Sequence, residues 1–422
     1  MYVNSISTED TCKFLNVKEF IRNDGRITYV ALRAIDVGEE LIVSYGHDYF
    51  QQANYTRFEC GMSAIAIAAA RGDAGRVRDM IADRRREGKN VSSLVNARAH
   101  EWTPLHEASN RGHAEAIAAL VEGGAIVDQA IQSNGKTSLT IASERGHTGA
   151  VKVLLAAGAS DDRARQDGET ALMGACHGGH RDVAELLLDQ GTDVGQAKHG
   201  GWTALMLACR NGHRDVCELL LDRGADVGQV DEDGMTALML ACQDGHRDVG
   251  ELLLDRGAVV GQADEDGWTA LMWACRMGHH EVAVLLLDRG ADVEQAKHDG
   301  WTALMLACRN GHRDVSELLL DRGSVVGQAD KYGWTALMLA CQDGHRDVAE
   351  LLLDRGADVG QANNDGTTAL MLARLAERGD VVELLLSRGN QRSPPRAADE
   401  LPDHAELGRL ASSRRIAVRT ST

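Results

Sequence analysis

The sequence predicts a mainly α-helical solenoid of stacked short repeats, preceded by a small β-rich segment. One motif of 33 residues recurs through most of the 422-residue chain. Glycine is frequent (45 residues), proline is rare (4), and the aromatic residues are few (Trp 6, Tyr 6, Phe 4), so the core must consist of Ala, Leu, Val, Met and Cys. Such small apolar side chains favour closely packed helices. Collagen-like, disordered and disulfide-rich classes are excluded by this composition.

Each repeat opens with a threonine. The spacing between these threonines is 34 residues once and 33 residues seven times, at Thr103, Thr137, Thr170, Thr203, Thr236, Thr269, Thr302, Thr335 and Thr368. A weaker first copy starts at Ser63, and the extra residues Arg84 to Ser93 are predicted to form a loop. A fixed period of this length is typical of a solenoid, in which each unit packs on its neighbours.

The repeat that starts at Thr203 predicts a helix, a turn, a second helix and a β-hairpin. Thr203 is expected to cap the first helix, which ends at Gly212, and Gly224 is expected to end the second helix in a left-handed conformation. The second helix has an apolar stripe at i, i+3 and i+4, formed by Val216, Leu219 and Leu220. Helices of about ten residues are not stable alone, so stacking must stabilise them.

These residues resemble the ankyrin repeat over about residues 63–389, and we assign about ten repeats to residues 57–390. Thr103-Pro104-Leu105-His106 matches the family's T-P-L-H motif, and a Gly-His turn recurs in the following repeats. The resemblance implies a curved stack of helix pairs with hairpins along one edge. It also implies recognition of a protein partner rather than catalysis.

Three departures from the ankyrin pattern carry further expectations. From Thr170 onward the motif reads T-A-L-M, which predicts an apolar ladder of methionines in place of the histidine. Glycine replaces the family's hairpin asparagine at Gly195, Gly228, Gly261, Gly327 and Gly360, which predicts mobile hairpins. In the last repeat the turn glycine is expected to have moved to Gly379.

Cysteine and histidine recur at fixed positions, but they do not indicate a metal or nucleophile site. Cysteines of successive repeats are separated by roughly 8–10 Å in a helix stack, too far for a disulfide or a shared zinc ion. They are therefore expected to be small buried residues, and the turn histidines are expected to bond to the backbone. We predict no metal and no cofactor for the array.

A stripe of tryptophans precedes the capping threonines. The resemblance implies that these residues, with the two residues before the Gly-His turn, are exposed on a concave recognition surface. The predicted partner-binding residues are Trp202, Arg210, Asn211, Trp268, Arg276, Met277, Trp301, Arg309, Asn310 and Trp334. Trp and Arg are typical of binding hot spots. The alternative is that each indole only covers the neighbouring hairpin.

The net charge of the chain and a duplicated segment indicate which kind of partner to expect. The chain has a net charge of −18, which disfavours nucleic acid and favours a basic segment of a protein partner. The segment KHGGWTALMLACRNGHRDV from Lys198 recurs almost unchanged from Lys297, so two similar binding surfaces and bivalent capture are expected. The sequence shows no signal peptide or spanning helix, which predicts a cytoplasmic or nuclear protein. It does not determine the oligomeric state.

The first 52 residues belong to no repeat. Alternating apolar residues at 27–31 and 41–43 predict two strands of a hairpin. This segment resembles the C-terminal half of a SET domain of the PR/SET subtype. Asn4 matches the Asn of the family's N-H-S motif, Gly38-Glu39-Glu40-Leu41 its strand entry, and Tyr45 the active-site tyrosine. Residues 391–422 are predicted to be a disordered tail.

The two resemblances together indicate two alternative functions for the chain. The first is a non-catalytic scaffold whose ankyrin groove binds a protein, with the SET segment as an inert remnant that lacks the upstream half of the domain. The second is a protein-lysine methyltransferase, in which the ankyrin array docks the substrate. The SET resemblance then implies S-adenosylmethionine as cofactor, with Asn4 near it and Tyr45 aligning the substrate amine. A truncated gene model of such an enzyme is a third alternative.

Overall fold

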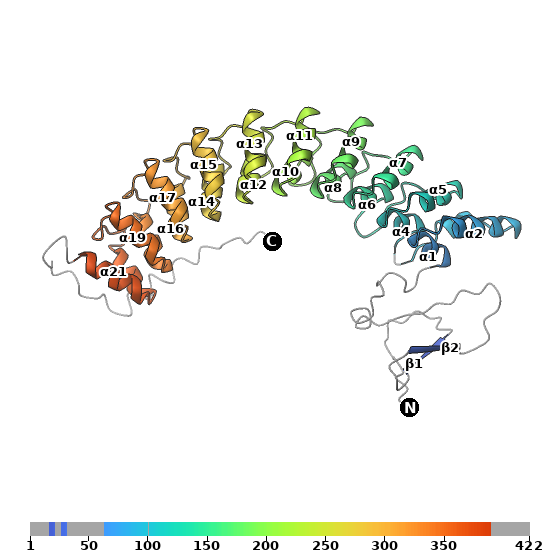
Figure 1. The fold of residues 1–422 in the computed structure, drawn as a ribbon, viewed down its shortest axis with the longest axis horizontal. Coiled ribbons are helices and arrows are strands. Elements are labelled where there is room, and N and C mark those ends of the chain that lie inside the picture. Colours follow the sequence, from blue (N-terminus) through green and yellow to red (C-terminus); the bar gives the residue numbers. More distant parts are fainter. Residues whose placement is uncertain (1–16, 22–26, 32–62, 100, 390–422) are drawn as a thin grey trace. The chain divides into compact units, whose positions relative to one another are not determined.

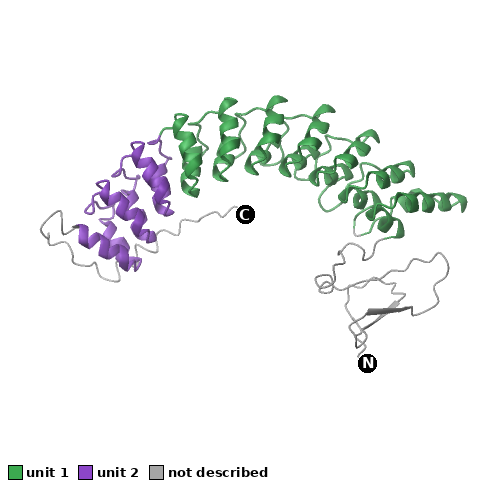
Figure 2. Ribbon diagram, in the orientation of Figure 1, with its two compact units in different colours: residues 1–292 green, residues 293–422 purple. Residues whose placement is uncertain are grey.

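The structure, a computed structural model, describes residues 17–21, 27–31, 63–99 and 101–389 (Figure 1). The chain divides into two compact units, Met1–Asp292 and Val293–Thr422 (Figure 2), and each is described by itself. Among the described residues, no helix has both the length and the apolar character that a membrane span requires.

The described residues of unit 1 form seven helix pairs, one for each repeat that starts at Ser63 or at one of the first six threonines. The pairs are α1 (Ala64–Ala70) with α2 (Ala74–Arg86), α4 (Pro104–Asn110) with α5 (Ala114–Glu122), α6 (Ser138–Glu144) with α7 (Thr148–Ala156), α8 (Ala171–His177) with α9 (Arg181–Asp189), α10 (Ala204–Arg210) with α11 (Arg214–Asp222), α12 (Ala237–Gln243) with α13 (Arg247–Asp255), and α14 (Ala270–Met277) with α15 (His280–Asp288).

Unit 2, as far as residue 389, contributes three more helix pairs. They are α16 (Ala303–Arg309) with α17 (Arg313–Asp321), α18 (Ala336–Asp343) with α19 (Arg346–Asp354), and α20 (Ala369–Leu375) with α21 (Gly379–Gly389). The prediction of a mainly helical repeat solenoid is therefore confirmed for the described repeats.

The threonine that opens each repeat caps its first helix. The hydroxyl of Thr203 accepts the N–H of Met206 at 3.2 Å, and the backbone of Thr203 is extended, as the sequence predicts. This bond satisfies one of the N–H groups that a helix start leaves free. Gly212 (φ +74°) forms the turn to α11, and Gly224 (φ +90°) follows the end of α11. Both glycines adopt the left-handed region that disfavours other residues.

Each repeat buries the same apolar positions between neighbours. In the repeat of α10 and α11, Leu205, Ala208, Val216 and Leu220 are at most 2% exposed. In unit 1, α10 packs on α8 and α12, and α11 packs on α9 and α13; the first helices lie on the inner side of this unit's arc (Figure 1). Stacking thus stabilises helices that are too short to be stable alone.

The methionine ladder is buried, as the T-A-L-M motif predicts. In unit 1, Met206 and Met239 are each 1% exposed. His106, which keeps the family's residue at this position, is fully buried; its Nδ1 lies 3.1 Å from the backbone N of Thr103 and its Nε2 2.8 Å from the carbonyl oxygen of Gln129. Burial lowers the pKa of His106 to about 4, so the ring is neutral at pH 7.

The insertion in the first repeat is helical in part, which corrects the predicted loop from Arg84 to Ser93. Helix α2 continues to Arg86, and a one-turn helix α3 (Ser92–Val95) follows. Val95 is fully buried. The insertion therefore contributes to the core at the start of the array, because one apolar side chain anchors it.

The predicted hairpins are reduced to single β-bridges. In unit 1 these join Ala197 to Thr203 and Val230 to Thr236, and the same pairing recurs in later repeats. The N–H of Gly228 donates to Asp226 Oδ1 at 2.9 Å, so an aspartate ties this turn although the family's asparagine is missing.

The last repeat differs from the expectation for Gly379. Glu377, with φ +57°, forms the turn, and Gly379 begins α21. Arg378 takes the place of the turn histidine: its Nε donates to the carbonyl oxygen of Gln342 at 3.3 Å. The long side chain of Arg378 thus replaces the imidazole as the link to the previous repeat.

In the N-terminal segment, β1 (Val17–Ile21) pairs antiparallel with β2 (Ile27–Ala31), with Glu19 opposite Tyr29. The strand predicted at 27–31 is present, but its partner here precedes it in the sequence. The strand predicted at 41–43, the SET motif residues Asn4, Gly38-Glu39-Glu40-Leu41 and Tyr45, and the tail 391–422 lie outside the described residues.

Candidate partner-binding surface

The turn histidines link consecutive repeats. In unit 1, His246 Nε2 lies 3.0 Å from the carbonyl oxygen of Arg210, and His213 Nε2 lies 3.0 Å from that of His177. Each ring also packs against the turn glycine of the previous repeat, as His246 does against Gly212. The expected hydrogen bonds from ring to backbone are confirmed, and these histidines are structural.

The inner surface of each unit is here the side that carries the first helices of its repeats. The predicted contact positions on this side are the residue before each capping threonine and the residues seven and eight after that threonine. The residue four after the threonine lies between them and is buried at Leu207 (5% exposed). In unit 1, Trp202 is half-buried, and Arg210 Cζ lies 5.3 Å from the centroid of its ring. Arg210 Nε is 3.6 Å from Asp244 Oδ2 of the next repeat. The indole therefore lies under a guanidinium group that an acidic neighbour orients.

Trp268 also lies beside an arginine and, unlike Trp202, has an aromatic partner. It stacks on Trp273 at 4.4 Å between ring centroids, and Arg276 Cζ lies 5.2 and 5.3 Å from the two rings. Met277, the next residue, is 47% exposed. The sequence analysis missed Trp273; the available signal was that a tryptophan stands there in place of the leucine at Leu207 and Leu240.

In unit 2 the duplicated segment repeats the geometry of Trp202. Arg309 Cζ lies 5.3 Å from the centroid of Trp301, and Arg309 Nε is 3.7 Å from Asp343 Oδ2. Trp334 is half-buried, but the position seven residues after its threonine is the uncharged Gln342. A guanidinium group therefore lies over the indole at Trp202, Trp268 and Trp301, which we call arginine-capped indoles, but the residue at the equivalent position near Trp334 is a glutamine.

Two of the predicted partner-binding residues are engaged with their own helices. The side-chain Nδ2 of Asn211 donates to the carbonyl oxygen of Leu207 at 2.8 Å, and Asn310 does the same to Leu306. These asparagines satisfy carbonyl groups at the helix end, so part of their hydrogen-bonding capacity is already used.

A pocket of about 610 Å³ lies on the inner surface of unit 1, and Trp202 and Arg210 form part of its wall. Leu207 and Gly174, from the position four after the threonine, also line it. Gly174 stands where neighbouring repeats have Ile141 and Leu207, so the large side chain of that position is missing here.

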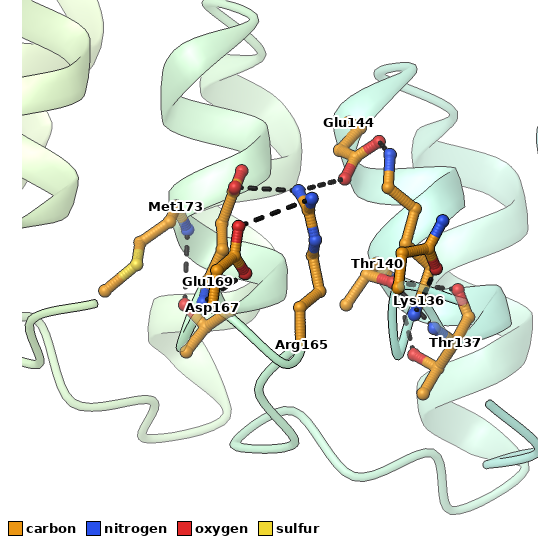
Figure 3. Close-up of polar contacts among 10 residues, drawn as sticks. Lys136, Thr137, Thr140, Glu144, Arg165, Asp167, Glu169 and Met173 are labelled. Atoms are coloured by element: carbon orange, nitrogen blue, oxygen red, sulfur yellow. Dashed lines mark hydrogen bonds and ion pairs between the residues drawn. The ribbon is translucent and has the colours of Figure 1, made fainter. Parts of the chain in front are cut away.

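Charged side chains of two consecutive repeats meet in this pocket (Figure 3). Glu144 lies between two cations: Lys136 Nζ is 2.5 Å from its Oε2, and Arg165 Nη1 is 3.4 Å from its Oε1. Arg165 Nη1 also bonds to Glu169 at 2.7 Å. Each of these four side chains is at most 25% exposed, so their interactions are screened less than those of surface pairs.

The comparison with protein families agrees with this architecture. A family model described as ankyrin repeats (three copies) matches five overlapping stretches of the chain. These are residues 65–165, 160–231, 223–297, 292–363 and 329–393. This chain belongs to the ankyrin-repeat family. No match to a SET domain accompanies these matches. A search of curated proteins found no match.

The cysteines of the ankyrin repeats are buried free thiols among the described residues. Burial raises the pKa of Cys308 and Cys341 to about 12, so they are protonated and unreactive at pH 7. Sequence reasoning considered only cysteines of successive repeats and missed Cys217, whose Sγ is 3.2 Å from Cys209 Sγ within one repeat. No group of three His, Cys, Asp or Glu suited to a metal occurs in the described part of the ankyrin array.

The pocket has a charge that differs from that of the chain. Its lining includes five cationic side chains, Lys136, Arg145, Arg165, Lys198 and Arg210, but only two carboxylates, Glu144 and Glu169. The net charge of the lining is thus +3 with the histidines neutral. Two carboxylates outside the lining, Asp167 and Asp244, pair with Arg165 and Arg210, so a net charge of +1 remains when they are included. The expectation of a basic partner segment rested on the acidic charge of the whole chain, and at this pocket the ankyrin array has the opposite charge.

Proposed function

We propose that this protein is a non-catalytic scaffold that binds a segment of a partner protein along the inner surface of its ankyrin repeats. The arginine-capped indoles of the inner surface support this proposal most directly. At Trp202 and Trp301, a half-buried indole and a guanidinium group form one flat, amphipathic contact area.

This arrangement suits recognition because it is already ordered before binding. Arg210 and Arg309 are oriented by carboxylates of the following repeat, Asp244 and Asp343. A partner that packs on such a side chain loses less conformational entropy than one that must first order it. Trp and Arg are also the residues most often found at binding hot spots. Because the same set occurs in each unit, one partner with two copies of a segment could bind with enhanced affinity.

We test the proposal by panning a displayed library of random peptides against the full chain. Selected peptides are expected to lose at least about tenfold in affinity for a Trp202→Ala, Trp301→Ala double variant, as measured by fluorescence anisotropy. The matched control is an Arg214→Ala, Arg313→Ala double variant, which is expected to keep the affinity. These two arginines begin the second helices α11 and α17 of the same two repeats. Unchanged affinity in the tryptophan variant, with folding retained by circular dichroism, would contradict the proposed surface.

The methyltransferase function remains a second hypothesis that rests on the SET resemblance of residues 1–52. Under the scaffold proposal, calorimetry of the full chain with S-adenosylmethionine is expected to show no binding heat. Micromolar affinity that is lost in a Tyr45→Phe or Asn4→Ala variant would instead favour the enzyme and make the ankyrin array its substrate-docking part.

A further inference from the structure

We infer that the pocket around Gly174 is a docking site for an acidic segment of the partner protein. The inference rests on the proposed function, because it assigns the chemistry of the partner at one place on the inner surface. Three features of the pocket support it: its positive charge, two cations without a counter-ion, and a small apolar floor.

The positive charge arises from a change of residue type in the turns before the capping threonines. In the next two repeats the turn position five before the threonine is Asp231 and Asp264, whose carboxylates accept backbone N–H groups of their own turns. In the pocket this position is occupied by Arg165 and Lys198. Replacing an acid by a base at two successive turns reverses the local charge.

Two of the cations have no acidic partner. Among the described residues, no carboxylate oxygen lies within 4.0 Å of the charged groups of Arg145 or Lys198, whereas Lys136 and Arg165 are paired with Glu144. Arg165 Nε is buried and has no hydrogen-bond partner in the described structure. A carboxylate from a partner would supply the missing charge and acceptor atoms.

The floor of the pocket favours a peptide with an apolar residue beside its acids. Leu207 and the indole of Trp202 form the apolar part of the lining, and at Gly174, where other repeats have a leucine, the side chain of Glu144 occupies the space instead. A Cβ atom on Gly174 would lie only 2.7 Å from Glu144 Cγ, so the glycine is also required for the position of Glu144.

Charge distribution favours a protein segment over nucleic acid. A nucleic acid carries phosphates along its whole length, and it would meet the acidic remainder of a chain with a net charge of −18. A short acidic segment places its charge only where the array is positive. A basic segment would face five cations in this pocket.

The experiment uses three fluorescein-labelled peptides of about ten residues, long enough in extended form to span roughly three repeats. In the first peptide Glu alternates with Leu, in the second Gln replaces Glu, and in the third Lys replaces Glu. Each is titrated into the full chain by fluorescence anisotropy. The Glu peptide is expected to bind at least about tenfold more tightly than the others, with an affinity that falls as salt is added.

Variants of the pocket give opposite and specific effects. Lys198→Gln is expected to weaken binding of the Glu peptide about fivefold, and Glu144→Gln to strengthen it about threefold, because each changes the charge of the pocket by one. Lys297→Gln is the matched control: Lys297 occupies the same position in the duplicated segment, is paired with Asp299 at 3.7 Å, and lies outside the pocket. This control is expected to leave the affinity unchanged.

The outcomes separate this inference from the proposed function. Preferential binding of the Gln or Lys peptide would overturn the acidic docking site and leave the scaffold function standing. Equal effects of Lys198→Gln and Lys297→Gln on the affinity of the Glu peptide would likewise overturn the docking site and leave the scaffold function standing. Tighter binding of a single-stranded oligonucleotide of equal charge would overturn the choice of a protein segment. Binding of no probe at all would overturn the acidic docking site, whereas the scaffold function would still be decided by the peptides selected from the random library.

Discussion

Replacing Gly212 by alanine is expected to destabilise the array by about 3 kcal/mol, whereas Gly224→Ala is expected to cost only about 1 kcal/mol. Both glycines have positive φ, +74° and +90°, so the backbone strain of an alanine is similar at the two positions. They differ in their surroundings. A Cβ on Gly212 would lie 2.5 Å from His246 Nδ1, and nothing lies within 4 Å of a Cβ on Gly224.

The additional cost at Gly212 comes from the contact between repeats. To accommodate the methyl group, His246 must move, and its ring then loses its 3.0 Å contact with the carbonyl oxygen of Arg210. Urea unfolding followed by circular dichroism measures both variants. In a Gly212→Ala, His246→Ala double variant the two losses are expected to be less than additive, because each removes the same contact. Equal effects of Gly212→Ala and Gly224→Ala would show that the histidine does not restrict this turn.

Replacing Glu107 by glutamine is expected to stabilise the protein above pH 7 and to have little effect near pH 4.5. Glu107 is only 5% exposed, and its Oε2 has no hydrogen-bond partner among the described residues. Burial raises the pKa of Glu107 to about 7 from an ordinary value of 4.5, although nearby Arg111 partly offsets the effect. The folded protein thus binds this proton more tightly than the unfolded chain does.

The direction of the pH dependence follows from this raised pKa. The stabilisation from the protonated carboxyl group is complete below pH 4.5 and is lost as the pH rises through 7. A shift of this size corresponds to a change of about 3 kcal/mol in the free energy of unfolding between these limits. Glutamine does not titrate, so the difference in stability between variant and wild type is expected to increase by about this amount from pH 4.5 to pH 8.

The measurement is a series of urea unfolding curves at half-unit pH steps. His106 titrates in the opposite sense, since its pKa is lowered to about 4, but it is present in both proteins and cancels in the difference. Glu232→Gln, at an exposed position in the same unit, is the control for the substitution itself. A flat difference for Glu107→Gln would mean that the carboxyl group is solvated in the native state.

The candidate surface could be predicted in part. The period of the threonines located the inner-surface positions, and Trp202, Trp268 and Trp301 were found because tryptophan is rare in this sequence. Lys136, Glu144, Arg165 and Lys198 were missed because each departs from the residue type of its repeat position: Lys136 stands at the position of Trp202, Glu144 at that of Arg210, and Arg165 and Lys198 at that of Asp231. Only the folded array brings these residues, which are up to 62 positions apart, into one pocket.

The sequence alone determined the repeating part of this protein. Local interactions fix the Thr203 cap, the left-handed glycines and the apolar stripes, and such interactions act over a few residues that can be recognised in the pattern. The tertiary structure decided which residues meet across repeats: His246 with Gly212 and Arg210, Lys136 with Glu144, and Glu144 with Gly174. These contacts depend on side-chain directions and on the stacking distance between helices, which no residue spacing specifies.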